Sequence, residues 1–114
     1  MSVSDEYLES VREWLSFVDG LRMRKMFGGA MVSQDDLPFA LIADDVLFLK
    51  ADEVNRPDFE AAGMEMFRPY PDKPMRMPYG EVPAEVLEDP EKFRRWVEGA
   101  LAAARRDAVK KRKK

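Results

Sequence analysis

The sequence contains no cysteine and no histidine, and these two absences exclude many kinds of functional site. Without cysteine there is no disulfide, no zinc–thiolate centre and no cysteine nucleophile. Without histidine there is no Ser-His-Asp triad, no histidine general base and no histidine-ligated metal. A cation site made only of Asp and Glu oxygens remains open to the composition. We expect no cofactor, no metal and no catalytic residue.

Long apolar runs and a leader pattern are also missing. No apolar run approaches the roughly 18–20 residues that a membrane-spanning helix needs. The first residues, Met1–Glu6, are polar and acidic, whereas a secretory signal peptide begins with basic residues and continues with an apolar stretch. The lack of cysteine fits a reducing compartment. We therefore expect a cytoplasmic protein with no membrane partner.

The residues that are present suit one domain with one hydrophobic core. The chain has 114 residues, of which 46% are hydrophobic and seven are Phe. The net charge of −3 is unevenly divided along the chain. Residues 1–99 hold 12 Lys/Arg and 21 Asp/Glu, a net charge of −9, and residues 100–114 hold seven Lys/Arg and one Asp, a net charge of +6. A basic end of this kind is typical of an arm that contacts nucleic acid or an acidic partner.

The first half of the chain predicts one helix and then strands. Apolar residues at helical spacing predict a helix over residues 4–18, and Gly20 ends it. Short apolar runs separated by turn residues follow, which predicts antiparallel strands beginning at Arg24–Gly29. Asp44-Asp45 suits a two-residue hairpin loop. Gly28-Gly29 inside a strand predicts a bulge or a close backbone approach.

The second half predicts two helices, a helical turn and two more strands. A short helix follows Asn55, and period-two alternation predicts strands over 64–68 and 75–79. A short helical turn is expected over Pro83–Leu87, and Asp89-Pro90 begins a last helix that should end near residue 105. We predict a single α+β domain over residues 1–106 with the order α-β-β-β-α-β-β-α, an antiparallel sheet and helices mainly on one face. Residues 107–114 are expected to form a basic disordered tail.

The most unusual segment is the basic and glycine-containing stretch near the first strand. Cationic side chains next to unobstructed backbone amides can hold an anion or a partner, but the pattern is neither a dinucleotide fingerprint nor a P-loop. The simpler alternative is a strand whose apolar residues pack and whose cations are solvated. The candidate residues are Arg22, Arg24, Lys25, Phe27, Gly28 and Gly29.

The basic end of the chain is the second candidate. Its cations can neutralise phosphates with an affinity that falls as salt rises, although no aromatic residue is present there to stack on bases. The alternative is a solubilising helix end whose first arginines complement the helix dipole. The candidate residues are Arg105, Arg106, Lys110, Lys111, Arg112, Lys113 and Lys114.

Three weaker patterns complete the candidates. The methionines concentrate in the predicted strands, where they either fill the core or form an adaptable apolar surface for a partner or a second copy of the chain. Acidic pairs at 35–36, 44–45 and 52–53 lie in predicted turns, where Asp is expected anyway. Tyr79 with Glu81 or Glu85 would form an acid–base pair in a small enzyme.

Several segments resemble the N-terminal domain of the TfoX/Sxy family of DNA-transformation competence regulators. The similar blocks follow one another in the same order over about residues 5–104: Arg24–Gly29, Phe39–Asp44, Leu47–Asp52, Phe59–Gly63 and Pro83–Pro90. The resemblance implies an α-β(3)-α-β(2)-α fold similar to the secretion chaperones. It also implies a regulatory role, because two-domain members act with the catabolite activator protein at competence-gene promoters. The sequence ends where their C-terminal domain would begin, so we expect a stand-alone N-terminal domain.

These observations support one leading hypothesis and two alternatives. The leading hypothesis is a non-enzymatic regulatory or adaptor module that binds a protein, such as a component or regulator of the transcription machinery, or a second copy of itself. The first alternative is a sequence-nonspecific nucleic-acid binder that uses the basic end together with Arg22, Arg24 and Lys25. The second is a small enzyme built on carboxylates and Tyr79.

Overall fold

The chain begins with a helix that a serine caps. The computed structural model describes residues 4–26, 28–69 and 72–112. Helix α1 (Asp5–Trp14) starts after Ser4, whose hydroxyl accepts a hydrogen bond from the Tyr7 amide. The helix ends before the predicted residue 18, although Leu15 and Val18 are still buried as the chain turns. Gly20, with a φ of +70°, then leads into the first strand.

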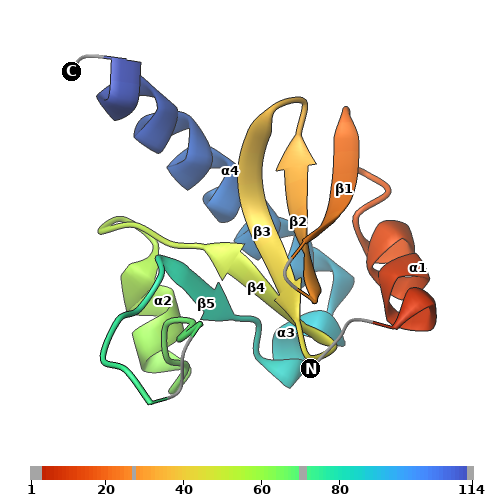
Figure 1. The fold of residues 1–114 in the computed structure, drawn as a ribbon, viewed down its shortest axis with the longest axis horizontal. Coiled ribbons are helices and arrows are strands. Elements are labelled where there is room, and N and C mark those ends of the chain that lie inside the picture. The colour runs from red at the N-terminus through yellow and green to blue at the C-terminus, as the bar shows by residue number, and fades with distance from the viewer. Residues whose placement is uncertain (1–3, 27, 70–71, 113–114) are drawn as a thin grey trace.

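Five strands form one antiparallel sheet in the described part of the chain (Figure 1). Its spatial order follows the chain order: β1 (Leu21–Met26), β2 (Gly29–Gln34), β3 (Leu37–Ala43), β4 (Val46–Lys50) and β5 (Tyr79–Glu81). Asp44 and Asp45 form the predicted two-residue loop between β3 and β4, and both have positive φ, as such a hairpin requires. In the β2–β3 turn Asp35 has a positive φ, of +54°.

The structure corrects the predicted start of the sheet. The first strand begins at Leu21 instead of Arg24, and four strands instead of three precede the second helix among the described residues. Gly28 and Gly29 do not lie inside one strand. Gly28, with a φ of +77°, is in the turn after β1, and Gly29 opens β2 opposite Met26. The predicted close backbone approach is confirmed, because a Cβ on Gly29 would collide with the carbonyl oxygen of Ile42.

The predicted strands at 64–68 and 75–79 are largely wrong. Helix α2 (Arg56–Ala61) is followed by a connection in which Met66 makes one isolated bridge to Gly80, and β5 begins only at Tyr79. Prolines at 69, 74 and 78 lack the N–H that a ladder needs, so alternation alone cannot form strands here. The connection packs instead through Phe67, whose ring lies 4.8 Å from that of Phe48.

Two helices close the chain, and the last is longer than predicted. Helix α3 (Ala84–Leu87) is the expected short turn, and α4 (Pro90–Arg112) begins after Asp89, whose carboxylate accepts from the amides of Glu91 and Lys92. The predicted end near residue 105 is wrong, since α4 continues to Arg112. Residues 107–112 are therefore helical, and Lys113 and Lys114 lie outside the described residues.

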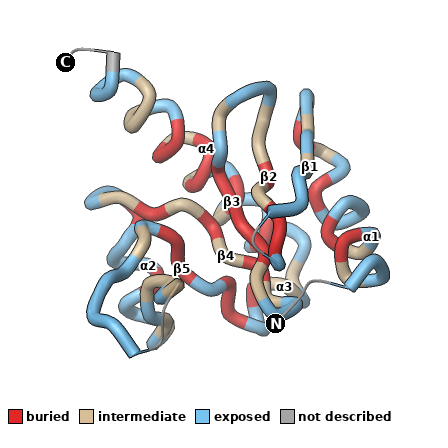
Figure 2. The backbone as a smooth tube through the Cα atoms, in the orientation of Figure 1, coloured by how far each residue is buried: buried red, intermediate tan, exposed pale blue. Residues whose placement is uncertain are grey.

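The core lies between one face of the sheet and the helices, as predicted for the α+β class. Burial is concentrated in the inner strands and the first half of α4, while most of β1 is exposed (Figure 2). One cluster joins residues of α1, α2, α3 and α4, such as Val11, Phe59, Val86 and Val97, to alternate strand residues such as Val32 and Ile42. The other face of the sheet carries no helix near β1 in Figure 1, and Arg22, Arg24 and Met26 are exposed there.

Candidate functional site

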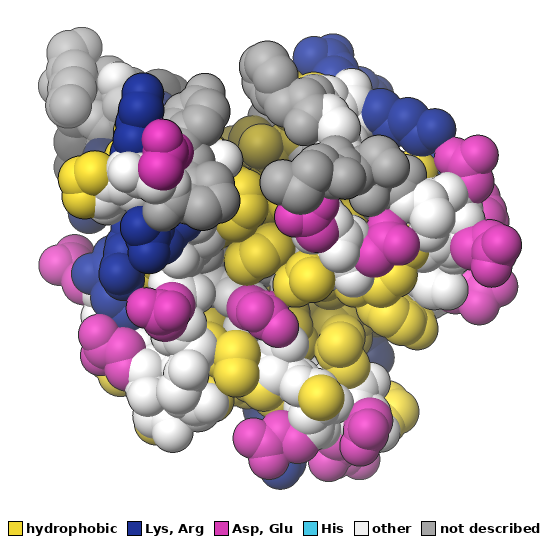
Figure 3. Space-filling model, turned by 60° about the horizontal axis from the view of Figure 1, so that its bottom comes forward, with side chains coloured by type: hydrophobic (Ala, Val, Ile, Leu, Met, Phe, Trp, Pro, Cys, Tyr) yellow, Lys and Arg dark blue, Asp and Glu magenta, His cyan; other side chains and the backbone are white. Residues whose placement is uncertain are grey.

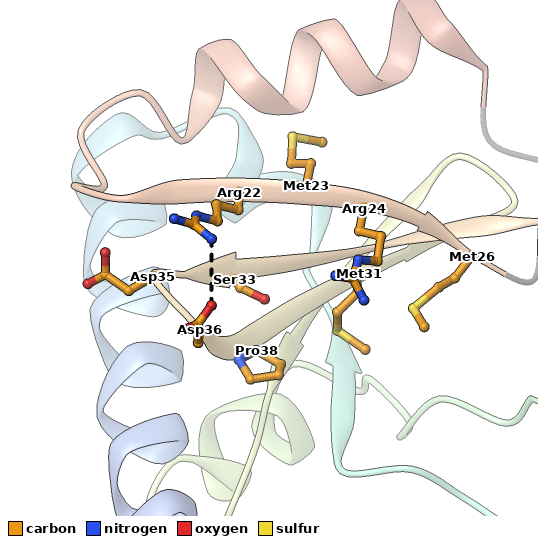
Figure 4. A pocket seen from close by; sticks show the side chains of 9 residues that line it. All are labelled: Arg22, Met23, Arg24, Met26, Met31, Ser33, Asp35, Asp36 and Pro38. Atoms are coloured by element: carbon orange, nitrogen blue, oxygen red, sulfur yellow. Dashed lines mark ion pairs between the residues drawn. The ribbon is translucent and has the colours of Figure 1, made fainter.

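The helix-free face of β1, β2 and β3 forms an open groove of about 580 Å³ (Figure 4). The register explains its lining, because Arg22 lies opposite Ser33 and Arg24 lies opposite Met31. Directly opposed residues in a sheet share one face. Met23, by contrast, points toward α1 in Figure 4. We call this the β1–β3 groove, and its other lining residues include Met26, Asp35, Asp36 and Pro38.

The groove carries two arginines that are weakly held. Arg22 pairs with Asp36 at 3.6 Å, but their side chains are 73% and 97% exposed, so solvent screens the pair. Arg24 is exposed and makes no ion pair with any described residue. Both guanidinium groups are therefore available to an anionic ligand at little cost.

The predicted anion-binding residues are divided between different places. Lys25 lies on the side of the sheet that faces α1, where its ammonium contacts Asp5 at 2.8 Å and lowers the pKa of that carboxyl. Gly28 is in the turn and Gly29 is buried against Ile42. Phe27 lies outside the described residues. Of the predicted set, the structure brings Arg22 and Arg24 together in the groove.

The methionines divide in the same way, between the core and the groove. Met23, Met64 and Met66 pack against the core. Met26 and Met31 line the groove, and Met26 is 36% exposed. The groove therefore combines guanidinium groups with flexible apolar side chains, a mixture that suits a protein surface.

The basic end of α4 is tied to acidic residues that follow β4. The Arg106 guanidinium donates to both oxygens of Asp52, at 2.6 and 3.0 Å, and Lys110 lies 3.6 Å from Glu53. Asp107 pairs with Lys50 at 3.4 Å and with Lys111 at 3.1 Å. These contacts, which we call the α4 latch, explain why the helix continues past its last apolar core residues. They also occupy cations that phosphate binding would need.

Arg105 and Arg112 are the tail candidates outside the latch that the structure describes. Arg105 is exposed and lies 3.5 Å from the Gln34 side-chain oxygen. Arg112 ends α4, and Lys113 and Lys114 lie outside the described residues. The sequence pattern alone did not indicate the latch, since Asp52 and Arg106 are far apart in the chain. The signal in the sequence is a pair of acidic residues directly after a strand, together with basic residues at 106 and 110, which share one face of the last helix.

The latch predicts a specific loss of stability in acid. The Arg106 hydrogen bonds, opposed by partial burial, lower the pKa of Asp52 from its usual 3.8 to about 2. A carboxyl with a lowered folded-state pKa stabilises the fold above its unfolded pKa and stops doing so as pH falls through the folded value. Between about pH 4 and pH 2 we expect a loss of about 1–2 kcal/mol, reduced by solvent because the Arg106 side chain is 38% exposed.

Urea unfolding of Asp52→Asn across this range checks the prediction. The difference in unfolding free energy between wild type and variant should shrink as pH falls from 4 to 2. Asp36→Asn is the matched control, because its arginine partner is in solvent, and it should differ little from wild type throughout. A wild-type advantage over Asp52→Asn that stays constant down to pH 2 would contradict the prediction.

Among the residues that the structure describes, the contacts of the acidic pairs and of Tyr79 stabilise the fold and do not form a cation site or an acid–base pair. Asp45 accepts hydrogen bonds from the amide and hydroxyl of Ser4 and so holds the start of α1 against the β3–β4 turn. No group of three Asp or Glu side chains converges on a cation position within the described residues. Burial, reinforced by the charge of Asp107, raises the pKa of Tyr79 to about 12, so its phenol keeps its proton at neutral pH. Glu81 and Glu85 are exposed.

A family model supports the resemblance seen in the sequence. The model of the TfoX N-terminal domain matches residues 13–104 of the 114-residue chain. No curated protein matches the sequence. No helix among the described residues is long and apolar enough to cross a membrane. The matched segment contains the entire β1–β3 groove, whereas Arg106 and Lys110 of the α4 latch lie beyond it.

Proposed function

Since the chain belongs to the TfoX N-terminal domain family, we propose that it is a non-enzymatic regulatory or adaptor module that binds a protein partner through the β1–β3 groove. Family membership supports a competence-related regulatory or adaptor role in general. The partner we propose is a component or a regulator of the transcription machinery. The observation that carries the proposal is the pairing of Arg22 and Arg24 with Met26 and Met31 on a helix-free sheet face.

The surface chemistry supports a protein ligand over a nucleic acid. Arginine and methionine are enriched at the cores of protein interfaces, where guanidinium groups pair with carboxylates and thioethers adapt to neighbouring side chains. Hydrophobic side chains also form a band across one face of the molecule, with acidic side chains and some Lys and Arg around it (Figure 3). The net negative charge of residues 1–99 repels a duplex, and the latch occupies Arg106 and Lys110.

Capture from a native cell extract tests the proposal. The groove variant carries Arg22→Glu and Arg24→Glu. The matched control carries Arg12→Glu and Arg56→Glu, which change the charge equally on exposed positions of α1 and α2. A protein held by wild type and control should be lost from the groove variant. With that protein purified, calorimetry should show binding at least about tenfold weaker for the groove variant alone.

Two results would count against the proposal. One is a captured protein that binds the groove variant and the control equally, which would place the interface elsewhere. The other is capture of nucleic acid alone, with an affinity that falls steeply as salt rises. Thermal unfolding of both variants confirms that any loss of binding comes from the surface and not from the fold.

A further inference from the structure

Strand β1 has a free edge. It is the first strand in the sheet order, so β2 is its only neighbour in the described sheet. Four of its six residues are exposed, and the two half-buried ones, Leu21 and Met23, face the core. Exposed sheet edges present unpaired N–H and C=O groups that can accept a strand from another chain.

The register shows which backbone groups are unpaired. The Asp35 amide donates to the Gly20 carbonyl at 2.8 Å, and the β1–β2 ladder continues from this pair in the same register. Bonded pairs alternate in an antiparallel ladder, so Arg22 and Arg24 bond to β2, while Leu21, Met23 and Lys25 direct their backbone groups away from it. No described backbone segment outside the sheet bonds to these three residues.

Resting on the proposed function, we infer that the partner supplies an extended segment with acidic residues at alternate positions, and that this segment adds to the free edge of β1 as an antiparallel strand. Its acidic side chains lie on the groove face beside Arg22 and Arg24. The residues between them are apolar and lie on the opposite face, beside Leu21 and Met23. Main-chain hydrogen bonds supply affinity, and the two guanidinium groups select the acidic pattern.

The charges on β1 favour an acidic partner over a second copy of the chain. When β1 pairs with itself about a twofold axis with matching faces, the register centred on Met23 places Arg22 opposite Arg24. The registers centred on Arg22 or Arg24 place two identical arginines opposite each other. Like charges directly opposed across strands are destabilising. A strand with glutamates at these positions replaces that repulsion with attraction.

The probe is a short acetylated peptide of alternating glutamate and valine, titrated into the full chain labelled with ¹⁵N. We expect amide exchange at Leu21, Met23 and Lys25 to slow by about tenfold or more as the peptide binds. A peptide with lysine in place of glutamate should bind about tenfold more weakly or worse. The Arg22→Glu and Arg24→Glu double variant should reverse this preference and bind the lysine peptide better.

Backbone methylation separates strand addition from simple charge attraction. Valine amides lie opposite Leu21 and Met23 and would pair with them, so N-methylation of the valines should weaken binding by about tenfold or more. N-methylation of the glutamates, whose amides point away from β1, is the matched control and should have much less effect.

Three results would overturn the inference. Equal binding of the valine-methylated peptide would show side-chain contact without strand addition, and the groove proposal would stand. If the glutamate peptide does not bind, the inference that an acidic strand adds to β1 is wrong. The capture experiment with cell extract then decides the proposed function separately. Slower exchange at the same three amides with rising protein concentration, without peptide, would identify a second copy as the occupant.

Discussion

Phe59→Ala is expected to lower the free energy of unfolding by about 3–5 kcal/mol. Phe59 is 1% exposed, and its ring meets that of Trp96 edge to face at 4.8 Å. It also fills the space above Gly80, where a Cβ would collide with the same ring. The substitution therefore leaves a cavity between α2, α4 and β5 that neighbouring backbone cannot close. Typical domains have a total free energy of unfolding of about 5–15 kcal/mol, so the expected loss is a large fraction of it.

Urea unfolding followed by tryptophan fluorescence measures the effect, because Trp96 reports directly on the ring that is lost. Phe48→Ala is the matched control: Phe48 is half-buried on the helix-free face, and its truncation should cost clearly less. Phe59→Leu keeps most of the side-chain volume, so its urea midpoint should lie between those of wild type and Phe59→Ala. It supplies a folded variant for comparison. Equal losses for Phe59→Ala and Phe48→Ala would contradict the position of the core.

Gly29→Ala is expected to cost about 3 kcal/mol, at the upper end of the usual range for overpacking. The added methyl group would meet the carbonyl oxygen of Ile42, which is backbone in the neighbouring strand β3. A flexible side chain could move aside, but this carbonyl is held by the β2–β3 ladder. The sheet must therefore shift at the start of β2, next to the groove.

Gly99→Ala provides a control of opposite sign. Its Cβ would lie 3.9 Å from the nearest atoms of Asn55, an ordinary contact, and its position is inside α4. Replacing an interior helical glycine by alanine should stabilise the protein by up to about 1 kcal/mol. Denaturation midpoints of the two variants should therefore move in opposite directions. A Gly29→Ala midpoint equal to that of wild type would show that β2 and β3 do not approach this closely.

Local sequence patterns were sufficient to predict the helix starts and the hairpin loop that depend on neighbouring residues. Ser4 before an acidic first turn, Asp44-Asp45 between apolar runs and Asp89-Pro90 before the last helix each form because neighbouring residues cap or turn the chain. Alternation misled at 64–68 and 75–79, because it does not reveal how far a ladder can extend. Phe67 shares backbone hydrogen bonds with Met77 and Tyr79, but nearby prolines lack the N–H groups that would continue the pairing. The same limit hid Leu21–Met23 as the true start of the sheet.

The candidate site shows the same division. The basic stretch at Arg22–Lys25 was visible in the sequence, but its cations looked equivalent there. Strand alternation and the position of α1 send Arg22 and Arg24 to the groove and Lys25 to Asp5. The latch between Asp52 and Arg106 joins residues distant in sequence, and it converts an expected loose tail into the end of α4.

Composition, capping residues and hairpin loops were enough to predict an α+β domain and to exclude histidine and cysteine chemistry, and the family was indicated by the resemblance of several segments. Sheet order, the free edge of β1 and the pairing of the basic helix end depended on contacts between distant segments. Such contacts depend on which surfaces the folded chain brings together, and a pattern of neighbouring residues carries no record of that.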